Sequence, residues 1–144
     1  MVHYRREART LALQALCQLD VQGSDSLDEL TEFLNEFSSD PGVILYAGQL
    51  VRQTHEHRQR YDALIAGAAL HWDIERMPIT DRNIMRMALC EMLDRDDPPP
   101  KVAIDEAIEL AKIFGTAESP QFVNGVLDAV LRSTAGSRGD VAAP

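Results

Sequence analysis

The chain has 144 residues, 45% of them hydrophobic, which is enough for one domain or two small subdomains sharing a core. Its formal net charge of −9 argues against a protein that coats nucleic acid without selectivity, because phosphate binding depends on cations. Cys17 and Cys90 are too few for a disulfide framework or a four-ligand zinc site, and no apolar run is long enough for a membrane span. We therefore expect a soluble, cytoplasmic protein without a membrane segment.

The first segment has the periodicity of an amphipathic helix. Between residues 4 and 22, apolar side chains recur at the spacing of one helical face, and Gly23 with Ser24 ends the pattern. The apolar positions are Ala8, Leu11, Ala12, Ala15, Leu16 and Leu19.

Helical periodicity continues through the next segments. Ser26 followed by Glu29 is a capping-box pattern, which predicts a helix to about Phe37. Residues 43–71 predict one long helix or two, because a polar section, 53–60, interrupts the apolar positions.

A further helix follows a short turn at residues 72–77. Thr80 or Asp81 is its candidate N-cap, and the pattern continues to about Asp94. The side chains predicted to face inward are Ile84, Met85, Ala88, Leu89 and Met92.

Prolines and glycines delimit the last two helices. The prolines 98–100 form a rigid connector, after which a helix runs to about Phe114. Gly115 is the candidate left-handed residue after that helix. Ser119 is the candidate N-cap of the last helix, which extends to about Ser133.

No segment alternates apolar and polar residues as a half-buried strand does. The sequence therefore predicts an all-α fold with six to seven helices in two packed helical bundles. We expect a single domain, 1–135, with subdomains at about 1–71 and 72–135, and a disordered tail at 136–144.

Motifs of catalysis are missing from the sequence. It has no phosphate loop, no dinucleotide fingerprint and no nucleophile or zinc-protease motif. His55 and His57 are two positions apart, so on a helix they point away from each other and cannot share one metal ion. We predict no enzymatic activity, no catalytic residue, no cofactor and no metal site.

Three arginines stand out near the N-terminus. Arg5, Arg6 and Arg9 lie to one side of the first predicted helix, over an arc of about 100°. Cations at a helix N-terminus oppose its dipole, so this placement favours a bound anion. The alternative is a solvated basic first turn.

The segment 122–128 places Asn124 and Gly125 inside the last predicted helix, where glycine costs about 1 kcal/mol relative to alanine. The pattern indicates that a neighbouring helix or a ligand approaches the backbone closely. Phe122 lies at the edge of the apolar face, where an aromatic ring either covers the core or stacks on a base.

Four groups of residues occur in order along the chain, and together they resemble the family of the bacterial transcription antitermination factor NusB over about residues 4–132. The groups are residues 5–9 with 13–16, 81–88 with 91–93, 100–112 with 114–115, and 122–128. The resemblance implies an all-helical, non-enzymatic protein. Members of this family bind the single-stranded boxA element of leader RNA, notably of ribosomal RNA operons, together with NusE, a small-subunit ribosomal protein. The complex joins elongating RNA polymerase and suppresses termination.

The resemblance also implies two sets of site residues. Those matching the RNA contacts of the family are Arg5, Arg6, Arg9, Glu118, Ser119, Gln121 and Phe122. Those matching its NusE-binding side are Arg76, Asp81 and Arg82.

Three departures from the family pattern bear on affinity. Glu7 interrupts the arginine run, Cys17 stands where a tyrosine is common, and Glu118 stands where a shorter acid often occurs. Because the bulk of the chain is also acidic, we expect weak RNA binding without NusE. The alternative function is a helical protein adaptor or homodimer, in which the arginine face meets an acidic protein surface and RNA is not bound.

Overall fold

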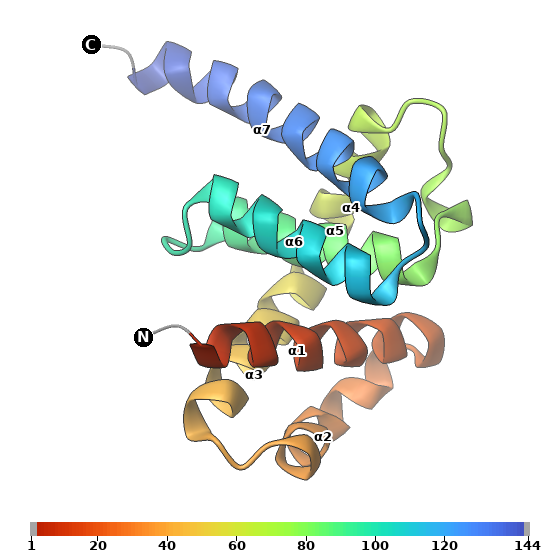
Figure 1. Cartoon of the computed structure of the whole chain (residues 1–144), viewed down its shortest axis with the longest axis vertical. Helices are drawn as coiled ribbons and strands as arrows, with labels where there is room; N and C mark the ends of the chain where they lie inside the picture. The colour runs from red at the N-terminus through yellow and green to blue at the C-terminus, as the bar shows by residue number, and fades with distance from the viewer. Residues whose placement is uncertain (1–2, 143–144) are drawn as a thin grey trace.

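The computed structural model describes residues 3–142, and this part contains seven α-helices, two short 3₁₀ helices and no strand (Figure 1). In chain order the elements are α1 (His3–Gln22), η1 (Ser24–Glu29), α2 (Leu30–Phe37), α3 (Pro41–Glu56), α4 (Arg58–Ala68), η2 (Ile74–Arg76), α5 (Ile79–Asp94), α6 (Pro100–Phe114) and α7 (Ser119–Ala142). The predicted all-α fold class is confirmed.

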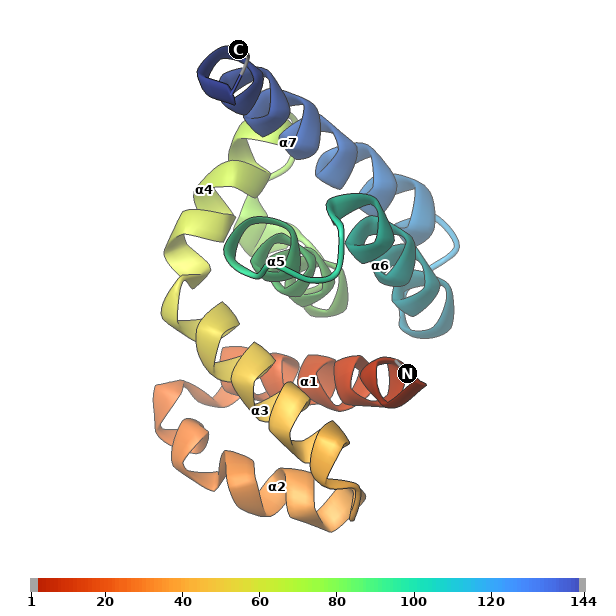
Figure 2. The same ribbon diagram turned by 90° about the vertical axis from the view of Figure 1, so that its left-hand side faces the viewer.

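The N-terminal bundle consists of α1, α2 and α3. α1 packs along α3, and α2 closes the side away from the rest of the molecule (Figure 2). Every apolar position predicted for the first helix is buried. Gly23, with φ of 92°, ends α1 in a conformation that favours glycine, and the Asp40 carboxylate caps α3 by accepting from the Gly42 N–H at 2.8 Å.

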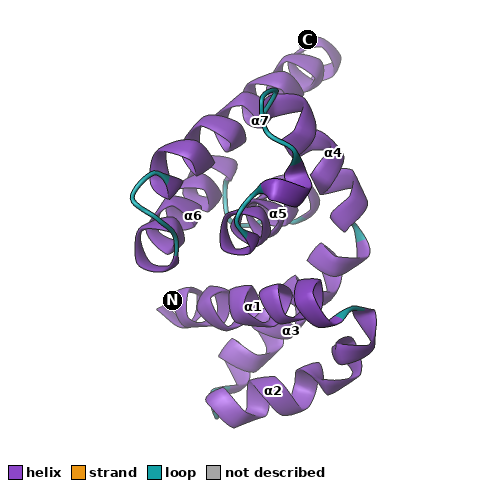
Figure 3. Ribbon diagram, turned by 90° about the vertical axis from the view of Figure 1, so that its right-hand side faces the viewer, coloured by secondary structure: helices purple, strands orange, loops and turns teal. Residues whose placement is uncertain are grey.

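The C-terminal bundle consists of α4, α5, α6 and α7, with α5 at its centre. α5 contacts the other three helices of this bundle and also α1 and α3 (Figures 2 and 3). The five side chains predicted to face inward are buried, but so are Met87, Cys90 and Glu91 on other faces of the helix. α5 is therefore enclosed on nearly all sides and joins the two bundles.

The boundary between the bundles differs from the prediction. Residues 43–71 form two helices that meet at His57, and the second, α4, packs against α5 and α7. The division between the bundles therefore lies near His57, and not between residues 71 and 72, because α4 buries Tyr61 and Ile65 in the C-terminal core.

Three predicted features of helix ends are wrong. Ser26 does not open an α-helix, since residues 24–29 form a 3₁₀ helix and α2 begins at Leu30. α5 begins at Ile79 without a side-chain cap, and Asp81 is buried in its first turn. Gly115 has φ of −96° and is not left-handed. The need for glycine there is steric, because a Cβ atom would lie 2.5 Å from the Ser119 side chain.

The last helix is longer than predicted. α7 runs to Ala142, so it includes most of the segment 136–144 for which the sequence predicted a disordered tail. Residues 143–144 lie outside the described part of the chain.

Candidate functional site

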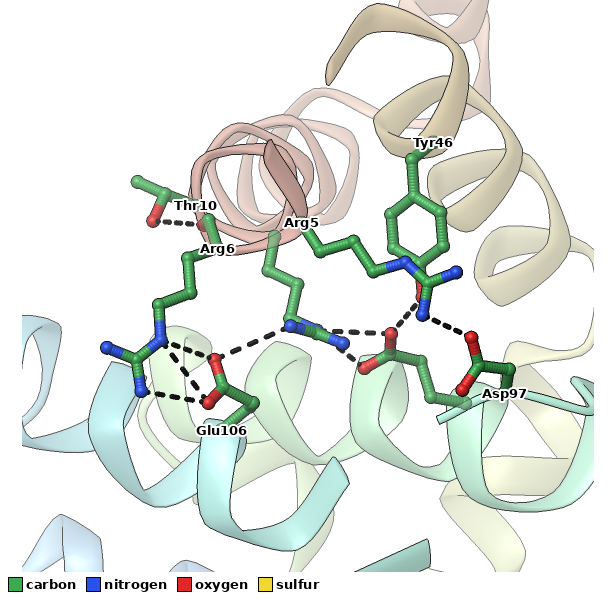
Figure 4. A network of polar contacts seen from close by, with 8 residues as sticks. Arg5, Arg6, Thr10, Tyr46, Asp97 and Glu106 are labelled. Carbon is green, nitrogen blue, oxygen red and sulfur yellow. Dashed lines mark hydrogen bonds and ion pairs between the residues drawn. The ribbon is translucent and has the colours of Figure 1, made fainter. Parts of the chain in front are cut away.

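The arginine cluster, defined as Arg5, Arg6 and Arg9, lies on the side of α1 that faces α6 and the loop before it. α1 holds these residues there because its apolar face is fixed against α3, which leaves the arginines directed towards the C-terminal bundle (Figure 4). The structure thus brings the three predicted residues together, as the helical spacing requires, but gives each a different environment.

Arg9 is buried at the junction of the two bundles, with only 6% of its side chain exposed. Its Nε donates to Glu91 on α5 at 2.9 Å, and its Nη1 lies 3.4 Å from Glu106 on α6. The Tyr46 hydroxyl from α3 also donates to Glu91, and burial together with the Glu91 charge raises the pKa of Tyr46 to about 12. Arg9 therefore joins four helices through a buried charge network.

Arg6 is the exposed member, with 69% of its side chain accessible. Its Nε and Nη2 each donate to the Glu106 carboxylate at 3.0 Å, in a two-point contact (Figure 4). Glu106 thus receives guanidinium groups from both Arg6 and Arg9 and anchors the cluster to α6.

Arg5 lies over the Tyr46 ring, with its guanidinium carbon 4.9 Å from the ring centroid. Its Nη1 donates to Asp97 at 2.5 Å (Figure 4). Its Nε is buried and has no hydrogen-bond partner among the residues whose side chains the structure describes, 4–23 and 27–134. The hydrogen-bonding capacity of this guanidinium is therefore only partly used.

An open hollow of about 440 Å³ lies beside the arginine cluster. Besides the arginines and their partners Asp97 and Glu106, its lining consists of Pro98, Pro99 and Val102. The hollow combines guanidinium groups with apolar surface, the mixture that suits a polyanion with apolar rings.

The second predicted RNA region lies at the turn between the C-terminal end of α6 and the start of α7. Ser119 is buried and its Oγ accepts from the Thr116 N–H at 2.9 Å, which holds the turn into α7. Glu118 and Gln121 are exposed. Phe122 is half-buried and meets Trp72 edge to face, with the ring centroids 5.6 Å apart.

The residues predicted to bind a partner are divided between two surfaces. Asp81 is only 4% exposed and lines a cleft of about 310 Å³ with Trp72 and Phe122. Arg82 turns the other way, to Asp20 at 2.9 Å, and Arg76 is exposed in η2. Asp81 therefore belongs with Phe122 rather than with Arg82.

Asp81 is incompletely paired in this cleft, which we call the Trp72 cleft. Its Oδ1 is buried without a hydrogen-bond partner in the described part of the chain. The pKa of Asp81 is raised, because the effect of burial exceeds the lowering effect of a hydrogen bond from Ser119. A hydrogen-bond donor entering the cleft would stabilise the ionised carboxylate.

Several functional side chains were missed in the sequence. Glu91, Asp97 and Glu106 pair with arginines more than 80 positions away, and no local pattern reveals such contacts. One feature of the sequence points to Trp72: it is the only tryptophan and lies in a predicted turn. It is 53% exposed, which is unusual for so large an apolar side chain.

Other kinds of site have little support in residues 3–142. Among the side chains that the structure describes, those of residues 4–23 and 27–134, no group of three or more His, Cys, Asp or Glu is placed to hold a metal ion. Burial raises the pKa of the Cys17 thiol to about 11, so it is not an activated nucleophile. No helix in this range is long and apolar enough to cross a membrane.

The fold and the site define a two-bundle helical protein with a guanidinium cluster beside α6 and a separate aromatic cleft near the start of α7. Residues 6–132 match the model of the NusB family. The chain belongs to the NusB family.

Known NusB proteins are similar in sequence to this chain over most of its length. The transcription antitermination protein NusB of Symbiobacterium thermophilum is 44% identical over 143 residues, covering 94% of each chain. That of Geobacter sulfurreducens is 46% identical over 129 residues, covering 88% of this chain and 92% of the relative.

Solved structures also superpose on this chain over most of its length. NusB of T. maritima superposes with a TM-score of 0.81 at 36% identity, covering 89% of this chain and 90% of the other. A chain in the crystal structure of the antitermination factors NusB and NusE in complex with double-stranded RNA gives a TM-score of 0.82 at 26% identity, covering 92% and 99%.

Proposed function

We propose that this protein is a transcription antitermination factor that binds single-stranded boxA-type leader RNA together with NusE and helps RNA polymerase to read through terminators. The observation that carries the proposal is the arginine cluster on a chain of the NusB family. A relative of the same fold was crystallised with NusE and RNA, which supports the choice of partners.

The three arginines have different roles in this proposal. Arg6 is exposed and Arg5 is partly exposed, so both can reach an RNA phosphate, to which a guanidinium pairs through two hydrogen bonds. Arg9 is buried by Glu91 and Glu106, so we assign it the role of holding α1 against α5 and α6. RNA affinity then depends on Arg9 through the position of the other two.

The start of α7 forms the second RNA contact. The first N–H groups of a helix attract phosphate, and Phe122 offers an aromatic face for an unpaired base. Gln121 is an exposed hydrogen-bonding side chain beside them, and the buried Ser119 fixes the turn. Glu118 is acidic, so it disfavours close approach of the strand and limits affinity.

The surface around Asp81 and Arg76 is our proposed NusE contact. The unpaired Asp81 Oδ1 in the Trp72 cleft favours a donor group from a protein partner, and a cationic one would also face the Trp72 ring. Arg82 is held by Asp20, so its part in this contact is to fix α5 rather than to present a free charge.

The test is a titration of boxA RNA with this protein, with and without NusE, at several salt concentrations. We expect weak binding alone and tight binding with NusE, because the net charge of −9 repels RNA at long range. Replacing Arg5 and Arg6 together by Ala should weaken binding and reduce the slope of log K against log salt by about 0.7 per lost phosphate contact.

Arg132→Ala is the matched control, because Arg132 is exposed on α7 and, among the described side chains, forms its one ion pair with Asp128 one turn away. An unchanged salt slope in the double variant would remove Arg5 and Arg6 from the RNA surface. RNA binding that is absent both with and without NusE would overturn the proposal and leave the adaptor or homodimer as the function.

Asp81→Asn separates the partner surface from the RNA surface in the same titration. We expect this variant to bind RNA alone as the unmodified protein does, but to lose part of the gain produced by NusE. A loss of equal size with and without NusE would place Asp81 on the RNA surface instead.

A further inference from the structure

Asp97 differs from the other acidic partners of the arginine cluster. It lies in the loop between α5 and α6, with 60% of its side chain exposed, and it contacts Arg5 through a single carboxylate oxygen. Glu106 and Glu91, in contrast, are 16% and 2% exposed, belong to helices, and hold Arg9 as well as other side chains. Asp97 alone can leave its arginine without disturbing the packing between helices.

The carboxylate of Asp97 occupies a position that suits a phosphate oxygen. Its Oδ2 lies 2.5 Å from Arg5 Nη1, and both residues line the hollow beside the arginine cluster. The Tyr46 ring holds the guanidinium from one side and Arg5 Nε is buried, so an incoming anion and Asp97 compete for the terminal Nη donors.

Magnitudes favour displacement. An exposed ion pair between side chains contributes little to stability, whereas removing one partner from a buried pair leaves an uncompensated charge in the interior. A phosphate can therefore replace Asp97 on Arg5 at small cost, but it cannot replace Glu91 on Arg9.

We propose that Asp97 is an internal competitor of RNA, which occupies the phosphate position on Arg5 in the free protein and is displaced when RNA binds. This inference rests on the proposed RNA-binding function and assigns to Asp97 the role of lowering the affinity for RNA. Because RNA must displace Asp97 from Arg5, the protein alone binds RNA weakly. A partner that holds the RNA in place therefore has a larger effect on the affinity.

The experiment measures the affinity of boxA RNA for the full chain, with and without NusE, in Asp97→Asn and Asp96→Asn variants. Both substitutions remove one negative charge from the same loop, but Asp96 is exposed and forms no ion pair with the described side chains, those of residues 4–23 and 27–134. We expect Asp97→Asn to bind RNA about two- to fivefold more tightly than Asp96→Asn, the factor that corresponds to an exposed ion pair. Asp97→Ala, which also removes the amide acceptor, should gain at least as much.

Repeating the comparison in an Arg5→Ala background tests whether Asp97 acts on RNA affinity through Arg5. If Asp97 acts through Arg5, the difference between the Asp97 and Asp96 variants disappears when Arg5 is absent. Equal affinities of the two Asn variants, or a difference that persists without Arg5, would overturn the inference while leaving RNA binding intact. No RNA binding by any variant, with or without NusE, would overturn the proposed function and this inference together.

Discussion

At the scale of single residues, burial decides what each arginine does. Arg6 keeps its guanidinium at the surface, whereas the Arg9 guanidinium is enclosed by Glu91, Glu106 and Tyr46. The helical spacing placed both on one side of α1 correctly. The spacing does not predict how far each arginine side chain is buried, because burial depends on contacts with carboxylates 82 and 97 positions further along the chain.

Arg9→Ala should lower the free energy of unfolding by about 3–5 kcal/mol, since it leaves the Glu91 charge buried with only Tyr46 as a donor. Denaturation in urea, followed by circular dichroism, measures the change. Arg6→Ala removes the same charge from an exposed position and should shift the midpoint very little. Similar midpoints for the two variants would contradict the structural role of Arg9.

At the scale of elements, the helices follow from local sequence but their ends often do not. The prolines predicted the start of α6 correctly, because proline fixes φ at a first helical position. Gly115 was assigned a left-handed conformation, and the structure shows instead that Ser119 leaves no space for a side chain there. Asn124 and Gly125 are exposed on α7, and apart from the adjoining residues and backbone of α7 itself no described atom lies within 4 Å of a Cβ built at Gly125.

The two glycines should respond in opposite directions to replacement by alanine. Gly115→Ala forces a clash with the Ser119 side chain and should destabilise the protein by about 1–3 kcal/mol. Gly125→Ala fills open space on a helix and should stabilise it by about 0.5–1 kcal/mol.

Thermal unfolding of the two variants beside the unmodified chain tests this pair. Destabilisation by Gly125→Ala would mean that the backbone at this position needs glycine for a reason within the chain. If stability rises while RNA or NusE binding falls, the glycine serves a close approach by a partner.

At the scale of the whole molecule, charged side chains join the two bundles at both ends of α1. One junction is the Arg9 network, and the other is Asp20, which accepts from Arg82 and Arg86 of α5. Burial alone would raise the pKa of Asp20, but the hydrogen bond from Asn83 and the two arginine charges outweigh it and hold the pKa below its ordinary value. The contact between the bundles is therefore sensitive to acid.

We expect the free energy of unfolding to fall as the pH drops below about 4, the ordinary pKa of an aspartate. Asp20 and Asp94 both have lowered pKa values in the folded protein, so the unfolded chain binds more protons in this range and is favoured. Unfolding by urea at a series of pH values measures the slope.

Asp20→Asn should be less stable than the unmodified protein at neutral pH and should lose less stability on acidification, because its contribution is already absent. Asp105→Asn is the control, since Asp105 is exposed on α6 and forms no ion pair in the described chain. An acid response of Asp20→Asn equal to that of the control would show that this junction does not govern acid stability.

The sequence by itself determined the helical class, most of the helices, the gathering of three arginines on one side of α1 and the resemblance to the NusB family. These properties depend on periodicity and on residues close together along the chain. Only the tertiary structure decided that Arg9 is buried while Arg6 is exposed, that Asp97 pairs with Arg5, and that Asp81 shares a cleft with Trp72 and Phe122. The reason is physical: burial and ion pairing arise from packing between distant segments, which local periodicity does not specify.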